Sequence, residues 1–107
     1  MTIGEIKERL KETINDPMEL TELYARLSSE YSSLCDIISE VSRRRPQSWN
    51  EIRKDCTSDK QADRKWEMTQ DGTDYIAIKN ELKGLQKLLS DTRMRIVALQ
   101  DQSRNLY

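Results

Sequence analysis

Apolar residues recur at heptad spacing in two long segments of this 107-residue chain. The first repeat runs from residue 20 to residue 41, and the second runs from residue 75 to residue 106. A sustained seven-residue apolar repeat is typical of α-helices that pack against one another along their length. The pattern therefore predicts an all-α fold that contains two long helices and no strands.

Sequence signals for helix start and helix end bound the first long helix. Asp16 is a favourable N-cap, Pro17 suits the first helical position, and Glu19 is placed to reach back to the cap. Pro46 lacks a backbone donor and restricts the residue before it, so we expect the helix to end at Arg45. The first long arm is therefore predicted over residues 17–45. Its a positions are Leu20, Leu27, Leu34 and Val41.

The second long arm is predicted over residues 73–107, after Gly72. Gly72 either interrupts a longer helix or lies within it, and propensity alone leaves both possibilities open. The a and d positions of this arm are Tyr75, Ile78, Leu82, Leu85, Leu89, Thr92, Ile96, Leu99, Ser103 and Leu106. Its length is similar to that of the first arm.

Shorter helices are expected on either side of the first arm. Thr2 and Glu5 have capping-box spacing, which predicts a short helix within residues 1–15. Residues 46–72 form a polar join in which Ser48 is a candidate N-cap for one short helix. Ser58 and Gln61 form a second capping-box pattern that predicts another.

Two arms of similar length on either side of this join predict a helical hairpin with antiparallel arms, in a single domain over residues 1–107. Only 36% of the residues are hydrophobic, none is Phe, and 35% are charged, so one hairpin has little core. We therefore expect copies of the chain to self-associate, although heptads of Leu and Ile do not fix the number of copies. The residues expected to mediate association are Leu20, Leu27, Leu34, Val41, Leu82, Leu85, Leu89, Ile96 and Leu99.

Positive charge is concentrated in the join. Residues 43–66 contain eight basic and four acidic residues, a net charge of +4, whereas residues 1–42 carry −5 and residues 67–107 carry zero. The basic residues are Arg43, Arg44, Arg45, Arg53, Lys54, Lys60, Arg64 and Lys65. Lys and Arg dominate phosphate affinity, and aromatic rings stack on the bases of single strands. The eight basic residues with Trp49 and Trp66 are therefore a candidate surface for single-stranded DNA.

The two tryptophans also have structural interpretations. Trp49 shares a helical face with Ile52 and Cys56, which favours a position in the core. Trp66 has only Ala62 and Thr69 as neighbours on its face, so core and surface are equally open for it.

The sequence lacks the common motifs of enzyme active sites. The chain has no histidine, no Gly-rich phosphate loop and no Ser-His-Asp set, and its two cysteines lack metal-ligand spacing. The acidic row of Glu5, Glu8 and Glu12 is expected to be a solvated face rather than a Mg²⁺ site. We therefore expect a non-enzymatic protein without cofactor, metal or small-molecule substrate.

No apolar run approaches the roughly 18 residues that a membrane span requires, so we expect no membrane partner. A cytoplasmic protein with reduced thiols is the corresponding expectation for the two cysteines.

The run PQSWNEIRKDCTSDKQADRKWEMTQDG and the tail ELKGLQKLLSDTRMRIVALQDQSRN resemble small coiled-coil proteins of bacteriophages. The order of a short helix, a long helix, a basic Trp-containing join and a second long helix is similar to that of phage recombination mediators. The resemblance implies a homo-oligomer that binds single-stranded DNA and assists a recombinase or replication protein in the cytoplasm of an infected or lysogenic bacterium. A structural or adaptor coiled coil that acts only through protein-protein contacts is the alternative.

Overall fold

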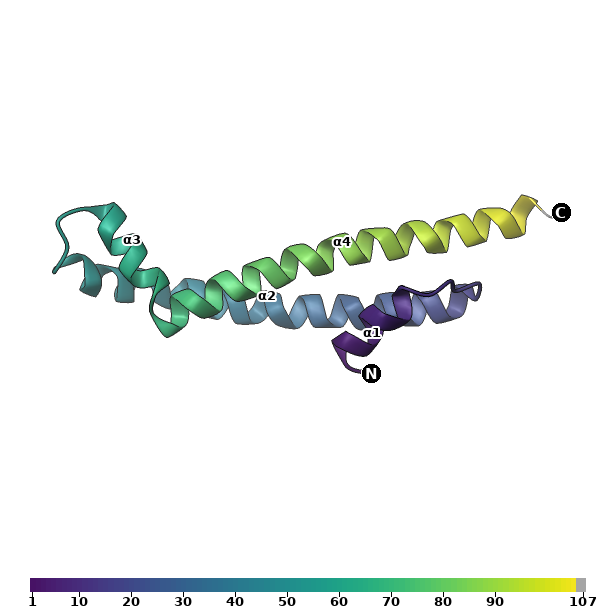
Figure 1. Cartoon of the computed structure of the whole chain (residues 1–107), viewed down its shortest axis with the longest axis horizontal. Helices are drawn as coiled ribbons and strands as arrows, with labels where there is room; N and C mark the ends of the chain where they lie inside the picture. The colour runs from purple at the N-terminus through teal and green to yellow at the C-terminus, as the bar shows by residue number, and fades with distance from the viewer. Residues whose placement is uncertain (106–107) are drawn as a thin grey trace. The chain divides into compact units, whose positions relative to one another are not determined.

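The computed structural model of the chain describes residues 1–105, and within that range it contains four α-helices and no strand (Figure 1). The helices are α1 (Ile3–Leu10), α2 (Pro17–Arg53), α3 (Asp59–Glu67) and α4 (Gln70–Asn105). The all-α class expected from the heptads is confirmed. None of the helices is long and apolar enough to cross a membrane in the described part of the chain.

The helices pack into two compact units. Unit 1 consists of residues 1–32 together with the chain from Gly84 onward, and unit 2 consists of residues 33–83. Both long helices take part in both units, because α2 passes from the first into the second and α4 passes back again.

α1 begins where the capping box predicts. The Thr2 hydroxyl oxygen accepts a hydrogen bond from the backbone N–H of Glu5 at 3.2 Å. The helix ends at Leu10 and therefore covers less of residues 1–15 than we expected. Ile14 lies after the helix but is still buried.

The start of α2 also follows the sequence signals. The Asp16 carboxylate accepts a hydrogen bond from the Met18 N–H at 3.0 Å, and Pro17 is the first helical residue. Glu19 was expected to reach back to this cap, and that expectation is wrong. Its carboxylate instead accepts two hydrogen bonds from the Arg9 guanidinium, at 2.6 and 2.9 Å.

The expected end of the long helix at Arg45 is wrong. α2 continues through Pro46 to Arg53, so Ser48 and Trp49 lie within α2 rather than in a separate helix of the join. An internal Pro costs a helix about 3 kcal/mol or more. Arg44 and Arg45 make contacts to α3 and α4 on the N-terminal side of Pro46, and Trp49 contacts α3 on its C-terminal side. These contacts hold both sides of the proline in place.

α3 and α4 are separate helices, and the break between them precedes Gly72. Ser58 caps α3, and its hydroxyl oxygen accepts from the Gln61 N–H at 3.2 Å, as the capping pattern predicts. α4 begins at Gln70, so the second arm starts earlier than residue 73 and Gly72 is the third residue of α4. A Cβ on Gly72 would lie 2.0 Å from the Trp66 carbonyl oxygen. The tight turn between the helices therefore requires glycine at this position.

The core of unit 1 is built from α1, the first part of α2 and the last part of α4. Its buried apolar residues are Ile6, Leu10, Ile14, Leu20, Leu23, Leu27 and Leu85. Thr92 is also buried, and its hydroxyl donates to the Leu88 carbonyl at 2.7 Å. Leu20 and Leu27 are a positions of the first heptad repeat, so the repeat identified part of this core.

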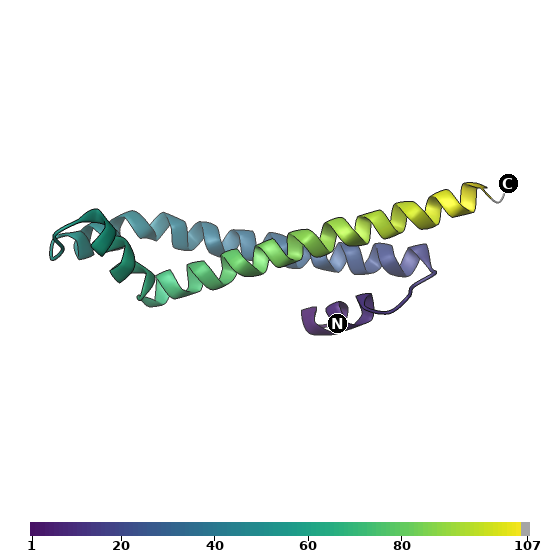
Figure 2. The same cartoon turned by 45° about the horizontal axis from the view of Figure 1, so that its top comes forward.

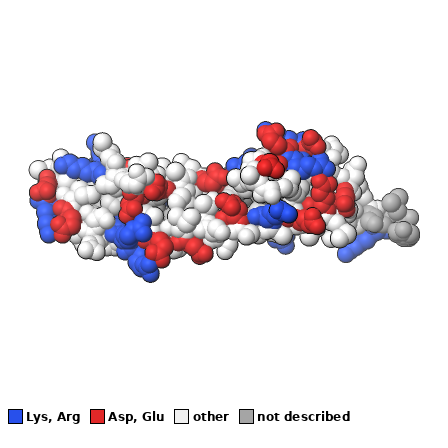
Figure 3. Space-filling view, turned by 90° about the horizontal axis from the view of Figure 1, so that it is seen from below, with Lys and Arg blue, Asp and Glu red and all other residues white. Residues whose placement is uncertain are grey.

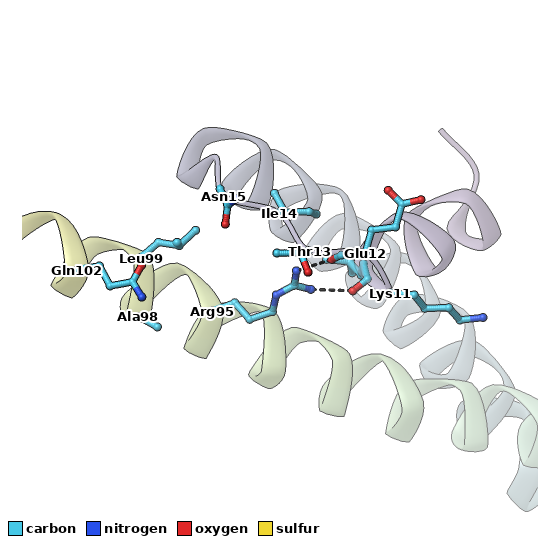
Figure 4. Close-up of a pocket in the computed structure, with 10 residues that line it drawn as sticks. Lys11, Glu12, Thr13, Ile14, Asn15, Arg95, Ala98, Leu99 and Gln102 are labelled. Atoms are coloured by element: carbon cyan, nitrogen blue, oxygen red, sulfur yellow. Dashed lines mark hydrogen bonds between the residues drawn. The ribbon is translucent and has the colours of Figure 1, made fainter.

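Arg95 ties α4 to the segment that follows α1. Its guanidinium donates to the carbonyl oxygens of Leu10 at 2.7 Å and Glu12 at 2.9 Å (Figure 4). The last carbonyls of a helix lack partners within the helix, so these hydrogen bonds satisfy groups that would otherwise need water. Arg95 also lines a pocket of about 460 Å³ beside residues 11–15, but its guanidinium is already engaged by the backbone.

The core of unit 2 is smaller. α3 lies beside the end of α2 in both views (Figures 1 and 2), and the buried apolar residues are Val41, Ala62 and Trp66. Trp66 is only 1% exposed. Its ring meets Tyr75 of α4 edge to face, with centroids 5.8 Å apart. Trp66 is therefore the central packing residue of this unit.

The heptad residues assigned to self-association divide into two groups. Leu20, Leu27, Val41 and Leu85 are buried within the chain, so they are not available to a second copy in this structure. The half-buried members are Leu34, Leu82, Leu89, Ile96 and Leu99. The Ser103 side chain and Leu106 of the second heptad series lie outside the described residues.

Candidate nucleic-acid interface

Carboxylates of the chain itself neutralise much of the basic sector of residues 43–66. Arg43 forms an ion pair with Glu40 on the same helix. Lys54 pairs with Glu51 at 3.1 Å. These ion pairs are exposed and each contributes about 0–1 kcal/mol to stability. They nevertheless lower the local positive potential that a phosphate would meet.

Arg53 is held at the end of α2. Its guanidinium donates to the Asp59 carboxylate at 2.8 Å and to the Cys56 carbonyl at 2.7 Å. The second contact satisfies a backbone acceptor just beyond the helix. Arg53 therefore fixes the connection between α2 and α3, and its charge is partly compensated.

Arg44 makes a two-point ion pair with Asp71 of α4, with N–O distances of 3.1 and 3.2 Å. The hydrogen bonds from Arg44 lower the pKa of the Asp71 carboxyl below its ordinary value. The same hydrogen bonds raise the pKa of the Arg44 guanidinium. This pair joins residues 27 positions apart and positions α4 against α2 within unit 2.

Both tryptophans have structural roles. The Trp49 indole N–H donates to the Asp63 carboxylate at 2.7 Å, so Trp49 links α2 to α3 while part of its ring stays exposed. The Trp66 ring is buried and is not placed to stack on a base. The spacing of Trp49 favoured a core position, but its side chain is only half-buried. Trp66 is the tryptophan that lies in the core.

Arg45 stacks on the buried aromatic cluster. Its guanidinium lies 4.3 Å from the Trp66 ring centroid and 5.7 Å from the Tyr75 ring centroid. The attraction between a cation and an aromatic face orients the guanidinium and contributes about 0.5–2 kcal/mol. Arg45 is consequently held in place by aromatic contacts, and no ion pair involves it among the described residues.

Two lysines of α4 join Arg45 at the edge of a pocket of about 330 Å³. We call this the cationic pocket, and the residues that define it are Arg45, Trp66, Glu67, Tyr75, Lys79 and Lys83. Three of these side chains are cationic and one is anionic. Lys79 lies 5.9 Å from the Tyr75 ring centroid, so cations and an aromatic face are adjacent.

Lys79 and Lys83 were not among the predicted binding residues, because residues 67–107 are neutral as a whole. Their spacing could have identified them as one surface, because Tyr75, Lys79 and Lys83 are four residues apart and share one face of a helix. The partner on α2 was not visible in the sequence. The pairing with Arg45 depends on how α2 and α4 pack.

Three of the basic residues that were predicted to bind DNA are exposed on α3. Lys60, Arg64 and Lys65 are solvent-exposed, and no ion pair involves them within the described residues. On the face shown in Figure 3, Lys and Arg alternate with Asp and Glu rather than forming one continuous positive field. The candidate interface therefore consists of the cationic pocket and these three exposed cations of α3.

The described residues contain no group of three or more His, Cys, Asp or Glu side chains arranged to hold a metal ion. Cys35 and Cys56 are free thiols and both are half-buried. The Cys56 thiol donates to the Ile52 carbonyl at 3.2 Å.

Comparison of the chain with protein-family models, with curated proteins and with solved structures finds no match.

Proposed function

We propose that the chain is a non-enzymatic helical binding protein whose cationic pocket engages single-stranded DNA. The observation that carries the proposal is the convergence of Arg45, Lys79 and Lys83 around Tyr75 in one pocket. Such a site needs no cofactor, metal or small-molecule substrate. Lys60, Arg64 and Lys65 of α3 would extend contact along the strand.

The chemistry of the pocket suits a single strand. Phosphates are bound through the charge of Lys and Arg, and bases stack on aromatic or guanidinium faces. Arg45 is already oriented by Trp66, so binding would cost less side-chain entropy than it would for an unrestrained arginine. Tyr75 is half-buried, so part of its side chain is exposed in the pocket.

The proposal retains three expectations from the sequence. α2 and α4 act as the coiled-coil arms of a hairpin, copies of the chain self-associate, and the assembly assists a recombinase or replication protein of a bacteriophage in the cytoplasm of its host. Association would bring several cationic pockets together, and multivalent contact raises affinity without any new type of interaction. The phage role rests on the resemblance alone.

A protein-only adaptor is the second candidate. Two observations favour it, namely the pairing of Arg43, Arg44, Arg53 and Lys54 with carboxylates and the exposure of apolar side chains such as Met94 on α4. In this case the protein associates but has no measurable affinity for DNA.

Fluorescence anisotropy of a labelled single-stranded oligonucleotide separates the two candidates. The test variant replaces Lys79 and Lys83 by Glu, because both side chains are exposed and their replacement leaves the core intact. The control replaces Lys11 and Lys87 by Glu. Both lysines are exposed outside the pocket, and the control changes the net charge by the same amount as the test variant.

We expect the pocket variant to bind at least tenfold more weakly than the control. The affinity of the wild-type protein should fall steeply between 50 and 200 mM salt, and the salt slope should decrease by about one for each lost phosphate contact. Equal weakening of both variants would overturn the assignment of the pocket. Absence of wild-type binding at micromolar protein would reject DNA binding and leave the adaptor.

A further inference from the structure

α4 carries an exposed face that unit 1 does not cover. The residues that line it, which we call the 90–101 face, are Ser90, Arg93, Met94, Val97, Ala98 and Asp101. They surround a shallow pocket of about 350 Å³, and their spacing of three and four residues places them in one stripe of the helix. Met94 is 68% exposed and Val97 is 47% exposed.

This face differs from the side of α4 that packs within unit 1. Leu85 and Thr92 are buried there, whereas Met94 and Val97 lie in the exposed stripe. Single exposed apolar residues are common on soluble proteins, but adjacent ones beside small residues form a surface on which another helix can pack. Ala98 and Ser90 leave room for the close approach of a second helix backbone.

Charge on the 90–101 face has a two-fold pattern. Arg93 and Asp101 are eight residues apart, and Val97 is the midpoint between them. Eight residues span about 12 Å of helix, so the two side chains are too far apart to pair on the same helix. Neither of them takes part in an ion pair among the described residues.

We infer that the 90–101 face is the contact between two copies of the chain, packed antiparallel about a two-fold axis at Val97. In that arrangement Arg93 of each copy lies opposite Asp101 of the other, and two equivalent ion pairs form. A parallel arrangement in register would instead set Arg93 against Arg93. The inference rests on the self-association proposed above and is independent of DNA binding.

The second copy is favoured over an unrelated partner because the face is complementary to itself. An isologous interface requires each patch to match its own image after a two-fold rotation. Opposite charges equidistant from an apolar midpoint satisfy this requirement. The face covers only about three helical turns, so the area that it buries is well below the roughly 1,600 Å² of a standard interface. A dissociation constant of about micromolar magnitude is therefore expected.

Charge reversal provides a direct test by sedimentation equilibrium in the absence of DNA. Arg93→Asp and Asp101→Arg each place two pairs of like charges at the interface, so each should weaken dimerisation at least tenfold. The double variant exchanges the two charges and remains complementary to itself. Its dimerisation should return to within about threefold of wild type.

Single variants that dimerise as well as wild type would show that association uses another surface, and additive weakening in the double variant would show that Arg93 and Asp101 do not face each other. Either result would overturn the proposed two-fold contact while leaving self-association in place. A protein that stays monomeric at all concentrations up to several hundred micromolar would overturn both. Neither result depends on the cationic pocket.

Cross-linking supplies a second readout that does not depend on charge. In a background with Cys35→Ser and Cys56→Ser, Val97→Cys places one thiol from each copy at the axis, where mild oxidation should form a disulfide-linked dimer. Lys87→Cys is the matched control, because it is exposed on α4 outside the face. Cross-linking of the Val97→Cys protein that is no faster than that of the Lys87→Cys protein would contradict the axis.

Discussion

Replacement of Gly72 by Ala is expected to destabilise the turn between α3 and α4, although Ala is the better helix former. An added Cβ would lie 2.0 Å from the Trp66 carbonyl oxygen and 2.6 Å from the Glu67 Cα. An unstrained C···O contact is about 3.3 Å or longer, so the two segments would have to separate by more than about 1 Å. Both obstructing atoms belong to the backbone, so a rotamer change cannot relieve the contact.

Two opposing contributions set the magnitude. Ala gains up to about 1 kcal/mol over Gly in a helix interior, but Gly72 is in the first turn of α4, where the gain is smaller. Overpacking costs about 1–3 kcal/mol when neighbouring backbone must shift. The shift would also loosen the packing of Trp66, which is 1% exposed. We therefore expect a net loss of about 2 kcal/mol or more in the free energy of unfolding.

Gly84 provides the matched control. It lies in the interior of α4, and a Cβ at this position meets no heavy atom within 4 Å among the described residues. Gly84→Ala should therefore stabilise the protein by about 0.5–1 kcal/mol through helix propensity and a less flexible unfolded chain.

Thermal and urea unfolding followed by circular dichroism at 222 nm would measure both variants at one fixed protein concentration, because association makes Tm depend on concentration. For a domain of about 100 residues, 1 kcal/mol corresponds to roughly 4–8 °C in Tm. Gly72→Ala should lower Tm by about 8 °C or more, and Gly84→Ala should raise it. A Gly72→Ala protein as stable as wild type would refute the steric reasoning.

Two further predictions concern ion pairs and hydrogen bonds between helices. Arg44→Gln should return the lowered pKa of Asp71 toward its ordinary value, which carboxyl NMR titration would detect. In the wild-type protein this pair stabilises the fold above the ordinary carboxyl pKa of about 4, and the contribution is lost as pH falls through the folded-state pKa of Asp71. An Asp71 titration unchanged by Arg44→Gln would contradict this account. Arg95→Ala leaves the Leu10 and Glu12 carbonyls without their donor, so amide hydrogen exchange in residues 11–16 should accelerate by about tenfold, equivalent to about 1.4 kcal/mol. Unaltered exchange there would show that Arg95 does not hold this segment.

Several helix starts could be predicted from the sequence because they depend on neighbouring residues. Thr2, Asp16 and Ser58 each bond to a backbone N–H two or three residues onward, so short patterns were sufficient to place them. The apolar stripes likewise identified buried residues such as Leu20 and Leu27. These features are local, and their energies change little with tertiary context.

The helix end at Pro46 shows where local reasoning stopped being sufficient. The proline penalty of about 3 kcal/mol is real, but contacts from Arg44, Arg45 and Trp49 to distant residues accompany the continued helix. Similarly, a single glycine at residue 72 could not show whether the helix broke there. The answer depended on the close approach of Gly72 to the Trp66 backbone.

The sequence alone determined that the chain is helical, where most helices begin, and which stripes are apolar. Tertiary structure decided the fate of the charges and aromatic rings, since Arg44 meets Asp71 and Arg45 meets Trp66 across different helices. It also brought Lys79 and Lys83 to the same pocket as Arg45. Helix propensity acts over a few residues, whereas burial and charge pairing depend on which helices become neighbours in space.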